Sequence, residues 1–396
     1  MRYDVTIVGL GGMGSAILAH CARRGASVLG LEQLARGHDL GSSHGKSRMI
    51  RKAYFEDPSY VPLLLRAYDL WRELEQRTGA ELLRITGLLM VGHEAAEVIT
   101  GARQAAREHN LPLESLTAPQ IRARYPMLRV QDDEIGVYEP DGGVLDPERS
   151  VAAHLHDASA AGAELRFETP MENWKATDDG FVIRLADGAT VESRALVLSL
   201  GPWFKQALGK LGIETHIQRN IQAWFAPATN EYAGGRFPPF LLDRQGLPAP
   251  LYGFPDFGDG VKAAFHAHGD LTEIAQLERE IDPERDIAPI VRAMEEWMPG
   301  AARSLRAARP CPYTLTPDHH FVVDRHPEHP RLILCGGFSG HGFKFAPVMG
   351  EICADLALAG DSRHEIGFFS LRRFRASGDR LLDSRPRDPS NGITHK

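Results

Sequence analysis

The sequence predicts an α/β fold, α+β overall, in which a Rossmann-like dinucleotide-binding domain is interleaved with a substrate domain built on a mixed sheet. Three observations carry this prediction. A strand, a glycine-rich turn, a helix and a second strand follow one another between residues 4 and 32. A strand, a glycine loop and a helix return near the end of the chain, at 332–360. A strand-rich stretch at 216–318 lies between the two.

The composition is that of a globular protein and excludes several classes of partner. The chain has 396 residues, of which 43% are apolar and 24% charged, and its formal net charge is −7. Without a block of basic residues it offers no electrostatic footprint for nucleic acid or anionic lipid. No apolar run approaches the roughly 18 residues of a membrane span. We therefore expect no nucleic-acid partner and no membrane partner.

The cysteines and the first residues predict the compartment. Cys21, Cys311, Cys335 and Cys353 stand at wide, irregular spacing, which gives neither a disulfide framework nor a zinc pattern. The chain opens on a strand, without the charged and apolar regions of a secretory signal. We therefore expect a cytoplasmic protein.

The first element is the dinucleotide-binding unit. Residues 4–8 predict a buried parallel strand, and the helix that follows the glycine turn ends at Gly25. A second strand at 27–31 ends on Glu32, where such units place the acidic residue that binds a ribose hydroxyl. Since no arginine stands beside Glu32 to receive a 2′-phosphate, the cofactor is NAD or FAD.

The turn of this unit fits the pattern G-x-G-x-x-G. Gly9 allows the tight turn, Gly11 lets the backbone approach a pyrophosphate, and Gly14 lets the helix pack closely on the strand. The helix N-terminus directs its partial positive charge at the phosphates. An NAD dehydrogenase would continue directly into further strand and helix units, and this chain does not.

A polar, glycine-containing loop at 37–57 follows, and helix and strand patterns then alternate. Apolar spacing and proline positions predict the helices, and short apolar runs predict the strands. The predicted helices are 59–77, 95–108, 116–126 and 147–161, and the predicted strands are 85–92, 164–168 and 195–201, with a hairpin around 178–188.

These elements predict two interleaved domains and a tail. The dinucleotide-domain pattern stops after the first helices, resumes in the middle of the chain and returns near its end. The predicted cofactor-binding domain comprises 1–84, 145–215 and 319–384, the predicted substrate domain comprises 85–144 and 216–318, and 385–396 are predicted to be a disordered tail.

The histidines do not indicate a metal centre. His319 adjoins His320, and His326 is followed by His329, but we find no carboxylate or thiolate partner at ligand spacing for either pair. The chain also lacks a G-x-S-x-G nucleophile motif. We therefore expect no metal.

Four longer motifs carry a family resemblance. They are GSSHGKSRMIRKAY (41–54), YGFPDFGDGVKAAFH (252–266), CPYTLTPDHHFVVDRHPEH (311–329) and GGFSGHGFKFAP (336–347). With them the chain resembles, over 3–374, the group of flavin amine oxidoreductases that contains monomeric sarcosine oxidase, N-methyltryptophan oxidase and pipecolate oxidase. This group belongs to the D-amino-acid-oxidase-like superfamily. Lys46 and Lys52 make the first motif more similar to the peroxisomal pipecolate and sarcosine oxidases than to the bacterial sarcosine oxidases.

The resemblance implies an FAD-dependent oxidase of secondary amino acids. It would oxidise sarcosine, or else L-pipecolate or N-methyltryptophan, to an imine and reduce O2 to H2O2. A same-fold FAD dehydrogenase with another electron acceptor is an alternative, and an NAD-dependent dehydrogenase or a non-catalytic binding module is a remote one. The implied partners are a small amino acid and O2, and the implied acting unit is a monomer.

The resemblance also implies the FAD contacts. Cys311 would form a thioether to the flavin, and its flanking prolines would restrict the thiol; from the residues alone, a buried structural thiol is the alternative. The remaining implied contacts are Ser43, His44, Gly337, Gly340, Gly342 and Lys344. His44 lies in a polar loop, where histidines also occur without a catalytic role.

Amine oxidation requires the neutral amine, and removing the proton of an ammonium with a pKa of about 10 costs about 4 kcal/mol at pH 7. A cation about 4 Å away contributes about as much at an effective dielectric constant of about 20. The resemblance assigns such cations: Arg51 and Lys344 would bind the substrate carboxylate, and Arg48 would lie beside the flavin. It further implies that Lys262 activates O2 and that His266, Tyr252 and Tyr313 line the substrate cavity. The alternatives are a lysine on a solvated strand edge and ordinary packed side chains.

Overall fold

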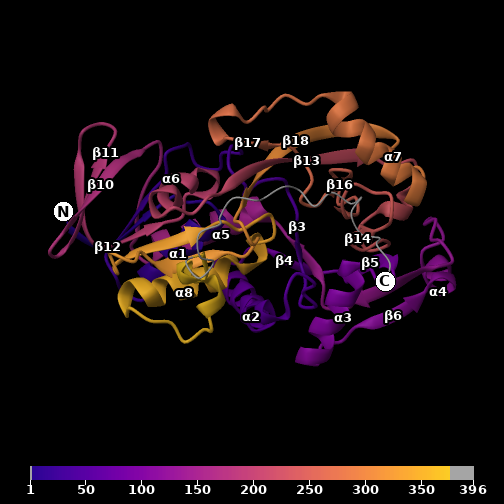
Figure 1. The fold of residues 1–396 in the computed structure, drawn as a ribbon, viewed down its shortest axis with the longest axis horizontal. Helices are drawn as coiled ribbons and strands as arrows, with labels where there is room; N and C mark the ends of the chain where they lie inside the picture. The colour runs from indigo at the N-terminus through magenta and orange to yellow at the C-terminus, as the bar shows by residue number, and fades with distance from the viewer. Residues whose placement is uncertain (1, 375–396) are drawn as a thin grey trace, which may run out of the picture.

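The computed structural model describes residues 2–374 (Figure 1). Residue 1 and residues 375–396 lie outside the described part. The predicted tail and the last residues of the predicted cofactor-binding domain fall in that part. Among the described residues, none of the helices combines the length and apolar character that crossing a membrane requires.

An eight-stranded sheet contains the predicted dinucleotide unit (Figure 1). Its central strands are parallel, in the order β20, β12, β1, β2, β9, and antiparallel strands extend it beyond β12 and β20. The strands are β1 (Arg2–Val8), β2 (Val28–Leu31), β9 (Glu164–Arg166), β10 (Met171–Thr177), β11 (Gly180–Leu185), β12 (Thr190–Leu198), β19 (Val322–Arg325) and β20 (Leu332–Gly336).

Helices cover both faces of this sheet, as buried parallel strands require. On one face, α1 (Gly12–Arg23) and α8 (Ala346–Leu358) contact the strands, and α2 (Val61–Thr78) and α5 (Pro147–Ala160) pack on those helices. Their shared core includes Val5, Ile17, Trp71 and Ile352. The short helix α6 (Lys205–Leu208) and the apolar side chains of Leu371 and Phe374 contribute to the core on the other face.

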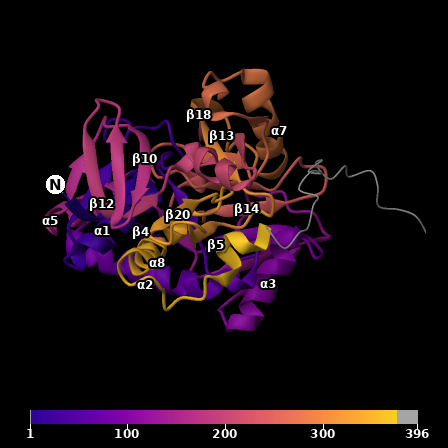
Figure 2. The ribbon, with the colours of Figure 1, turned by 60° about the vertical axis from the view of Figure 1, so that its left-hand side comes forward.

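A nine-stranded mixed sheet forms the second layer (Figure 2). Its order is β17, β13, β16, β15, β14, β5, β7, β6, with β18 on the other side of β13. The helices α3 (Glu97–His109), α4 (Ala118–Arg124) and α7 (Ala288–Trp297) pack against it. The strands are β5 (Leu88–His93), β6 (Glu114–Thr117), β7 (Glu134–Glu139), β13 (His216–Ala226), β14 (Phe240–Asp243), β15 (Leu251–Phe254), β16 (Val261–Phe265), β17 (Leu271–Thr272) and β18 (Ser304–Leu315).

The edge position of β18 explains its prolines. Among the described residues, β18 pairs with β13 alone, and Cys311 lies opposite Asn220 in that ladder. Pro310 and Pro312 flank it. Because proline is tolerated on an edge strand whose N–H positions face away from the ladder, the strand continues through both prolines with Cys311 between them.

A three-stranded antiparallel sheet, β3 (Arg48–Ile50), β8 (Gly143–Leu145) and β4 (Leu83–Ile85), has β8 at its centre. Two predictions are wrong here. The loop predicted at 37–57 contains β3, because its backbone pairs with β8. The strand predicted at 85–92 is two strands in different sheets, β4 and β5, because the chain turns at Gly87, whose φ is +73°.

One helix prediction is wrong at its start. The stretch predicted as a helix at 116–126 begins as β6, which pairs with β7, and α4 follows. Thr117 and Gln120 form a capping box at that boundary, so the helix begins two residues later than predicted. The two large sheets take their strands from the segments predicted for the two domains, while the division into domains stays a prediction.

Candidate active site

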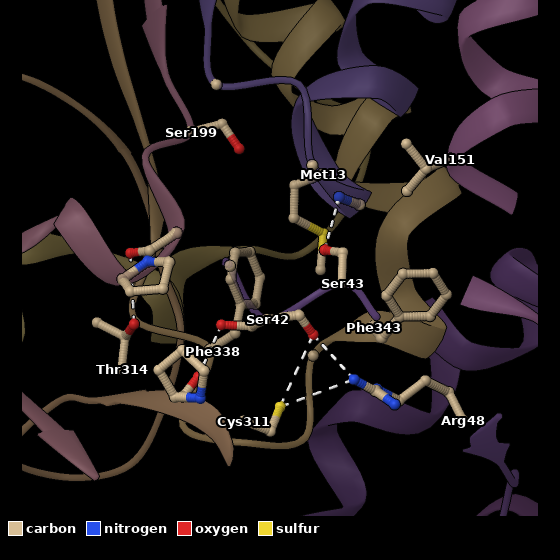
Figure 3. Close-up of a pocket in the computed structure, with 18 of the residues that line it drawn as sticks. Met13, Ser42, Ser43, Arg48, Val151, Ser199, Cys311, Thr314, Phe338 and Phe343 are labelled. Carbon is tan, nitrogen blue, oxygen red and sulfur yellow. Dashed lines mark hydrogen bonds between the residues drawn. The ribbon is translucent and has the colours of Figure 1, made fainter. Parts of the chain in front are cut away.

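A cavity is lined from both large sheets and brings five separate parts of the sequence together. These parts include the glycine turn before α1, the loop before β3, the strand β18 and the glycine loop before α8 (Figure 3). The strand β15 also belongs to the lining. Of the residues that the sequence predicts for the site, Gly14, His44 and Lys262 lie outside the lining. The rest line it: Gly9, Gly11, Glu32, Ser43, Arg48, Arg51, Tyr252, His266, Cys311, Tyr313, Gly337, Gly340, Gly342 and Lys344.

The glycine turn is a cradle with no room for side chains. Gly9 has φ +90°, and a Cβ added there would lie 2.2 Å from the carbonyl oxygen of Ser199. A Cβ on Gly14 would lie 1.7 Å from the carbonyl oxygen of Gly9, so Gly14 acts behind the cavity wall by letting α1 approach β1. The N-terminus of α1 therefore reaches the cavity as bare backbone, which suits a phosphate group.

Two side chains hold this cradle in place. The carboxylate of Glu32 accepts hydrogen bonds from the N–H groups of Leu10 at 2.8 Å and Leu34 at 3.0 Å, and it remains part of the cavity lining. The hydroxyl of Ser43 accepts from the N–H of Gly12 at 2.9 Å. A carboxylate at the end of β2 beside an open helix N-terminus matches the ribose and pyrophosphate of a dinucleotide, so the residues present fit FAD.

Cys311 lies in the cavity wall beside a cation. Its side chain is 2% exposed, and the Nη2 of Arg48 lies 3.8 Å from its Sγ (Figure 3). The same nitrogen donates to the carbonyl oxygen of Ser42 at 2.9 Å, which fixes the guanidinium next to the thiol. The sulfur therefore belongs to the cavity lining and lies near a permanent positive charge.

His44 is buried behind the wall. It is 3% exposed, and neither of its ring nitrogens has a hydrogen-bond partner among the described residues. Burial, reinforced by Arg48 and Lys262, lowers the pKa of His44 to about 3. The imidazole is therefore neutral at physiological pH. It lies outside the cavity lining, whereas the resemblance implies that it contacts FAD.

Lys262 also lies behind the wall. It is 1% exposed, its Nζ donates to the carbonyl oxygens of Gly45 at 2.8 Å and Ser47 at 3.0 Å, and it stands 5.2 Å from the ring centre of the lining residue Phe254. Burial, and then the charge of Arg48, lowers its pKa well below the ordinary value. The permanent charge of this region is therefore that of Arg48.

Arg51, which the resemblance implies as a ligand of the substrate carboxylate, is paired with an acidic residue in this structure. The Nη2 of Arg51 donates to both carboxylate oxygens of Glu56 at 2.6 Å, and the guanidinium lies between the rings of Tyr54 and Phe55, 4.4 and 4.3 Å from their centres. Burial alone would raise the pKa of Glu56, but Arg51 and the neighbouring cations lower it to about 2. The pair is thus ionised at neutral pH.

Lys344 is the second cation of this part of the cavity. Its side chain is buried, and its Nζ donates to the carbonyl oxygen of His341 at 2.7 Å and lies 5.1 Å from the ring centre of Tyr54. Burial and the charge of Arg51 lower its pKa to about 7. Unlike Arg51, Lys344 therefore changes its charge within the physiological pH range.

Three aromatic side chains complete the polar part of the wall. The hydroxyls of Tyr252 and Tyr313 lie 3.5 Å apart, and the His266 ring lies 6.2 and 6.0 Å from their ring centres. Burial is the main cause that lowers the pKa of His266 to about 4. Its imidazole is neutral at pH 7 and can accept a hydrogen bond from a ligand.

The sequence reasoning missed several residues of the site. Glu56, the partner of Arg51, stands in the same polar segment but at a spacing with no periodic signal. Gln222 on β13 lines the cavity with a buried side-chain oxygen that has no partner among the described residues. Leu241 and Phe254 supply apolar wall.

One statement about the histidines is wrong. His326 and His329 do have a carboxylate at ligand spacing, because one donor atom each of these histidines and of Glu328 lie within 4.8 Å of one another. The group stands on the turn between β19 and β20, where the imidazole rings also stack, 5.1 Å apart.

Comparison with known proteins places the chain among flavoenzymes. A family model described as FAD dependent oxidoreductase matches residues 4–356. A protein named monomeric sarcosine oxidase, from Streptomyces avermitilis, is 42% identical over 382 residues, which cover 95% of this chain and 98% of its own. N-methyl-L-tryptophan oxidase from Yersinia pestis is 32% identical over 378 residues, which cover 95% of this chain and all of its own.

Solved structures agree with this placement. NikD, described as an unusual amino acid oxidase essential for nikkomycin biosynthesis, superposes with a TM-score of 0.83 at 26% identity and covers 93% of this chain and 97% of its own. The L-proline dehydrogenase from P. horikoshii shares the fold, with a TM-score of 0.82 at 19% identity over 95% of this chain and 98% of its own. The predicted fold class is confirmed, and the chain belongs to the FAD-dependent oxidoreductase family.

Proposed function

We propose that this enzyme oxidises a secondary amino acid and passes the electrons to O2. Sarcosine is the first candidate, and L-pipecolate and N-methyltryptophan follow. The observation that carries the proposal is the pair of buried cations, Arg51 and Lys344, in the wall of the cofactor cavity. Arg51 is paired with Glu56, whereas Lys344 has a carbonyl oxygen as its hydrogen-bond partner, so an anionic ligand would give its buried ammonium a counter-charge, and an amino acid brings a carboxylate. The similarity to a protein named sarcosine oxidase favours sarcosine.

FAD, when bound, accepts two electrons from the substrate and transfers them to O2. Gly9, Gly11 and Glu32 would hold its nucleotide half, because they form the cradle at the N-terminus of α1. Cys311 would be its covalent attachment point, since the thiol lines the cavity next to Arg48.

The cations would bind and prepare the substrate. Arg51 offers a planar guanidinium that suits a carboxylate, and Lys344 adds a second donor. Their charge also lowers the pKa of the substrate amine, whose deprotonation at pH 7 costs about 4 kcal/mol. His266, neutral because its pKa is about 4, would accept a hydrogen bond from the amine. Tyr252 and Tyr313 would exclude water beside it.

The region around Arg48 and Lys262 would serve the reaction with O2. A positive charge fixed in a dry site stabilises the negative charge that O2 acquires. Arg48 supplies that charge at the wall, and Lys262 stands one layer behind Phe254, held by two carbonyl oxygens. The acting unit would be a single chain.

The test is oxygen consumption and peroxide formation by the FAD-loaded enzyme with sarcosine, L-pipecolate, N-methyl-L-tryptophan, L-proline and glycine. We expect one O2 consumed and one H2O2 formed per sarcosine, and slower turnover with the bulkier amines. Loss of the visible FAD absorption under nitrogen without oxygen uptake in air would identify a dehydrogenase. No absorption change with any of these amines would refute the proposed function.

The covalent attachment has its own test. After acid precipitation of the purified protein, the yellow colour should remain in the pellet of the wild type and leave with the supernatant of Cys311→Ala. Cys335→Ala is the matched control, because Cys335 also lines the cavity but is not the cysteine proposed as the attachment point. Colour retained by Cys311→Ala would place the attachment elsewhere.

A further inference from the structure

One buried carboxylate beside the cavity takes no part in the function proposed above. Glu139, the last residue of β7, is 1% exposed and does not line the cavity. One of its oxygens accepts a hydrogen bond from the N–H of Lys52 at 2.5 Å, and the other accepts from the N–H of Ala53 at 3.2 Å. These two donors belong to the two residues that follow Arg51.

We propose that Glu139 is a positioning residue for Arg51. Its carboxylate fixes the backbone that follows Arg51, and this backbone sets the place of the guanidinium that receives the substrate carboxylate. The inference rests on the proposed function, because it requires a substrate that carries a carboxylate.

The backbone at this point has no regular structure to hold it. β3 ends at Ile50, and the chain from Arg51 to Phe55 belongs to neither a helix nor a strand. Its buried N–H groups therefore depend on a side-chain acceptor, and Glu139 supplies one oxygen to each of two neighbouring N–H groups. A carboxylate suits this task because both of its oxygens only accept.

A second set of contacts holds the side chain of Lys52 and not the backbone. The Nζ of Lys52 bonds to a carboxylate oxygen of Asp141 at 2.7 Å and lies 4.9 Å from the ring centre of Tyr68. The Tyr68 hydroxyl donates to the carbonyl oxygen of Asp141 at 2.7 Å. Two sets of contacts therefore hold this segment. Asp141 and Tyr68 contact the Lys52 side chain, and Glu139 binds the peptide N–H groups.

The burial of Glu139 gives this anchor a pH dependence. The groups that face it are Arg51 and Lys52 from the anchored segment, Asp141 from the connection between β7 and β8, and Tyr68 from α2. Burial raises the pKa of Glu139 to about 7, although the two N–H bonds and Arg51 oppose the shift. The carboxylate is therefore present above about pH 7 and is lost as the pH falls through that value.

The test measures binding of methoxyacetate, a carboxylate without an amine, to the FAD-loaded enzyme through the change in its visible absorption. In Glu139→Gln, the dissociation constant at about pH 8.5 should rise about tenfold, because an amide offers one acceptor to two N–H donors. Methoxyacetamide, which lacks the carboxylate, should bind wild type and variant equally. Glu192→Gln, at an exposed position on β12, is the matched control and should change neither constant.

The pH dependence separates positioning from mere packing. The ratio of the variant and wild-type dissociation constants should fall towards one as the pH drops below 7, since the wild type then loses its own carboxylate. Lys344 titrates near the same pH in both proteins, so its effect cancels in the ratio. A ratio that stays constant with pH, or that equals one at about pH 8.5, would overturn the role of Glu139.

A measurement on the wild type keeps the inference testable if the variant does not accumulate. Hydrogen exchange of the Lys52 and Ala53 amides, corrected for the intrinsic rate, should lose protection as the pH falls through 7. Unchanged protection would contradict the anchor. A wild type that binds no methoxyacetate and oxidises no amino acid would instead refute the proposed function, and protection of the two amides would still report on the anchor.

Discussion

The nucleotide cradle and the cationic part of the same cavity are built in different ways. The cradle is made of backbone: Gly9 and Gly14 remove side chains, and the N-terminus of α1 supplies the partial charge. The cationic part is made of side chains, and Arg51 and Lys344 are buried where charge is unfavourable. The cradle therefore depends on steric fit, while the cationic part depends on partners and on pH.

The cradle is therefore the rigid part of the site, and the cationic part responds to conditions. A Cβ cannot be added to Gly9 or Gly14 in the cradle without moving the backbone. Arg51 keeps its charge with Glu56 as its partner, whereas Lys344, paired with a carbonyl oxygen, has a pKa of about 7. Substitutions should accordingly abolish cofactor binding in the first region and tune substrate binding in the second.

The most severe defect, a loss of the cofactor itself, is expected from Gly14→Ala. The added Cβ would lie 1.7 Å from the carbonyl oxygen of Gly9, so the turn has to move. We expect FAD retained after gel filtration to fall by at least about tenfold, as overpacking of this kind costs about 1–3 kcal/mol. Gly209→Ala is the control, because its φ is −59° and its Cβ would meet no atom within 4 Å. Normal FAD content in Gly14→Ala would show that the cradle is not rigid.

The next largest effect concerns the reaction with O2. Lys262→Met should slow reoxidation of the reduced enzyme by about 100-fold or more, the usual cost of losing one fixed electrostatic donor. Reduction by sarcosine under nitrogen should stay within about threefold of the wild type, since Lys262 does not line the cavity. Lys175→Met, at an exposed position, should alter neither rate. Equal slowing of both half-reactions would mean that Lys262 only supports the fold.

Removal of Arg51 should weaken both substrate binding and the stability of the fold. Arg51→Met should lower kcat/KM for sarcosine by about 100-fold, which corresponds to about 3 kcal/mol for a charged hydrogen-bonded contact. It should also lower the melting temperature, because Glu56 is left buried and unpaired. Adding Glu56→Gln should restore part of the melting temperature but not kcat/KM. Recovery of activity in the double variant would exclude Arg51 as the carboxylate site.

The smallest effect is the pH dependence of Lys344. Its lowered pKa means that the ammonium is present below about pH 7 and is lost above it. The dissociation constant for methoxyacetate should therefore rise by up to about tenfold between about pH 7 and 8.5 in the wild type. The rise should disappear in Lys344→Met. An unchanged rise in that variant would assign the titration to another group.

The same contrast separates what the sequence could predict from what it could not. The cradle is local: its strand, turn, helix and terminal acid lie within 32 residues, so pattern alone gave Gly9, Gly11 and Glu32. The cationic part is assembled from distant segments. Only the resemblance of whole motifs predicted that Arg51 and Lys344 bind the same substrate carboxylate.

The misses have physical reasons. Glu56 and Glu139 act through partners that the fold brings close, and a single acid in a polar segment carries no signal of its partner. The break between β4 and β5 depends on which sheet each half joins, which periodicity does not encode. The motifs assigned His44 to FAD and Lys262 to O2, but a motif does not distinguish the cavity wall from the layer behind it.

The binding of the substrate carboxylate by buried cations is tested most directly by comparing sarcosine with sarcosinamide, its amide without a carboxylate, as reductants of the same enzyme under nitrogen. The amide holds more of its amine unprotonated at neutral pH, so amine chemistry alone would make it the faster substrate. If buried cations receive the carboxylate, kcat/KM should favour sarcosine by about 100-fold, as one charge-assisted bidentate contact would require. Equal or faster reduction by sarcosinamide would show that the buried cations do not receive the carboxylate.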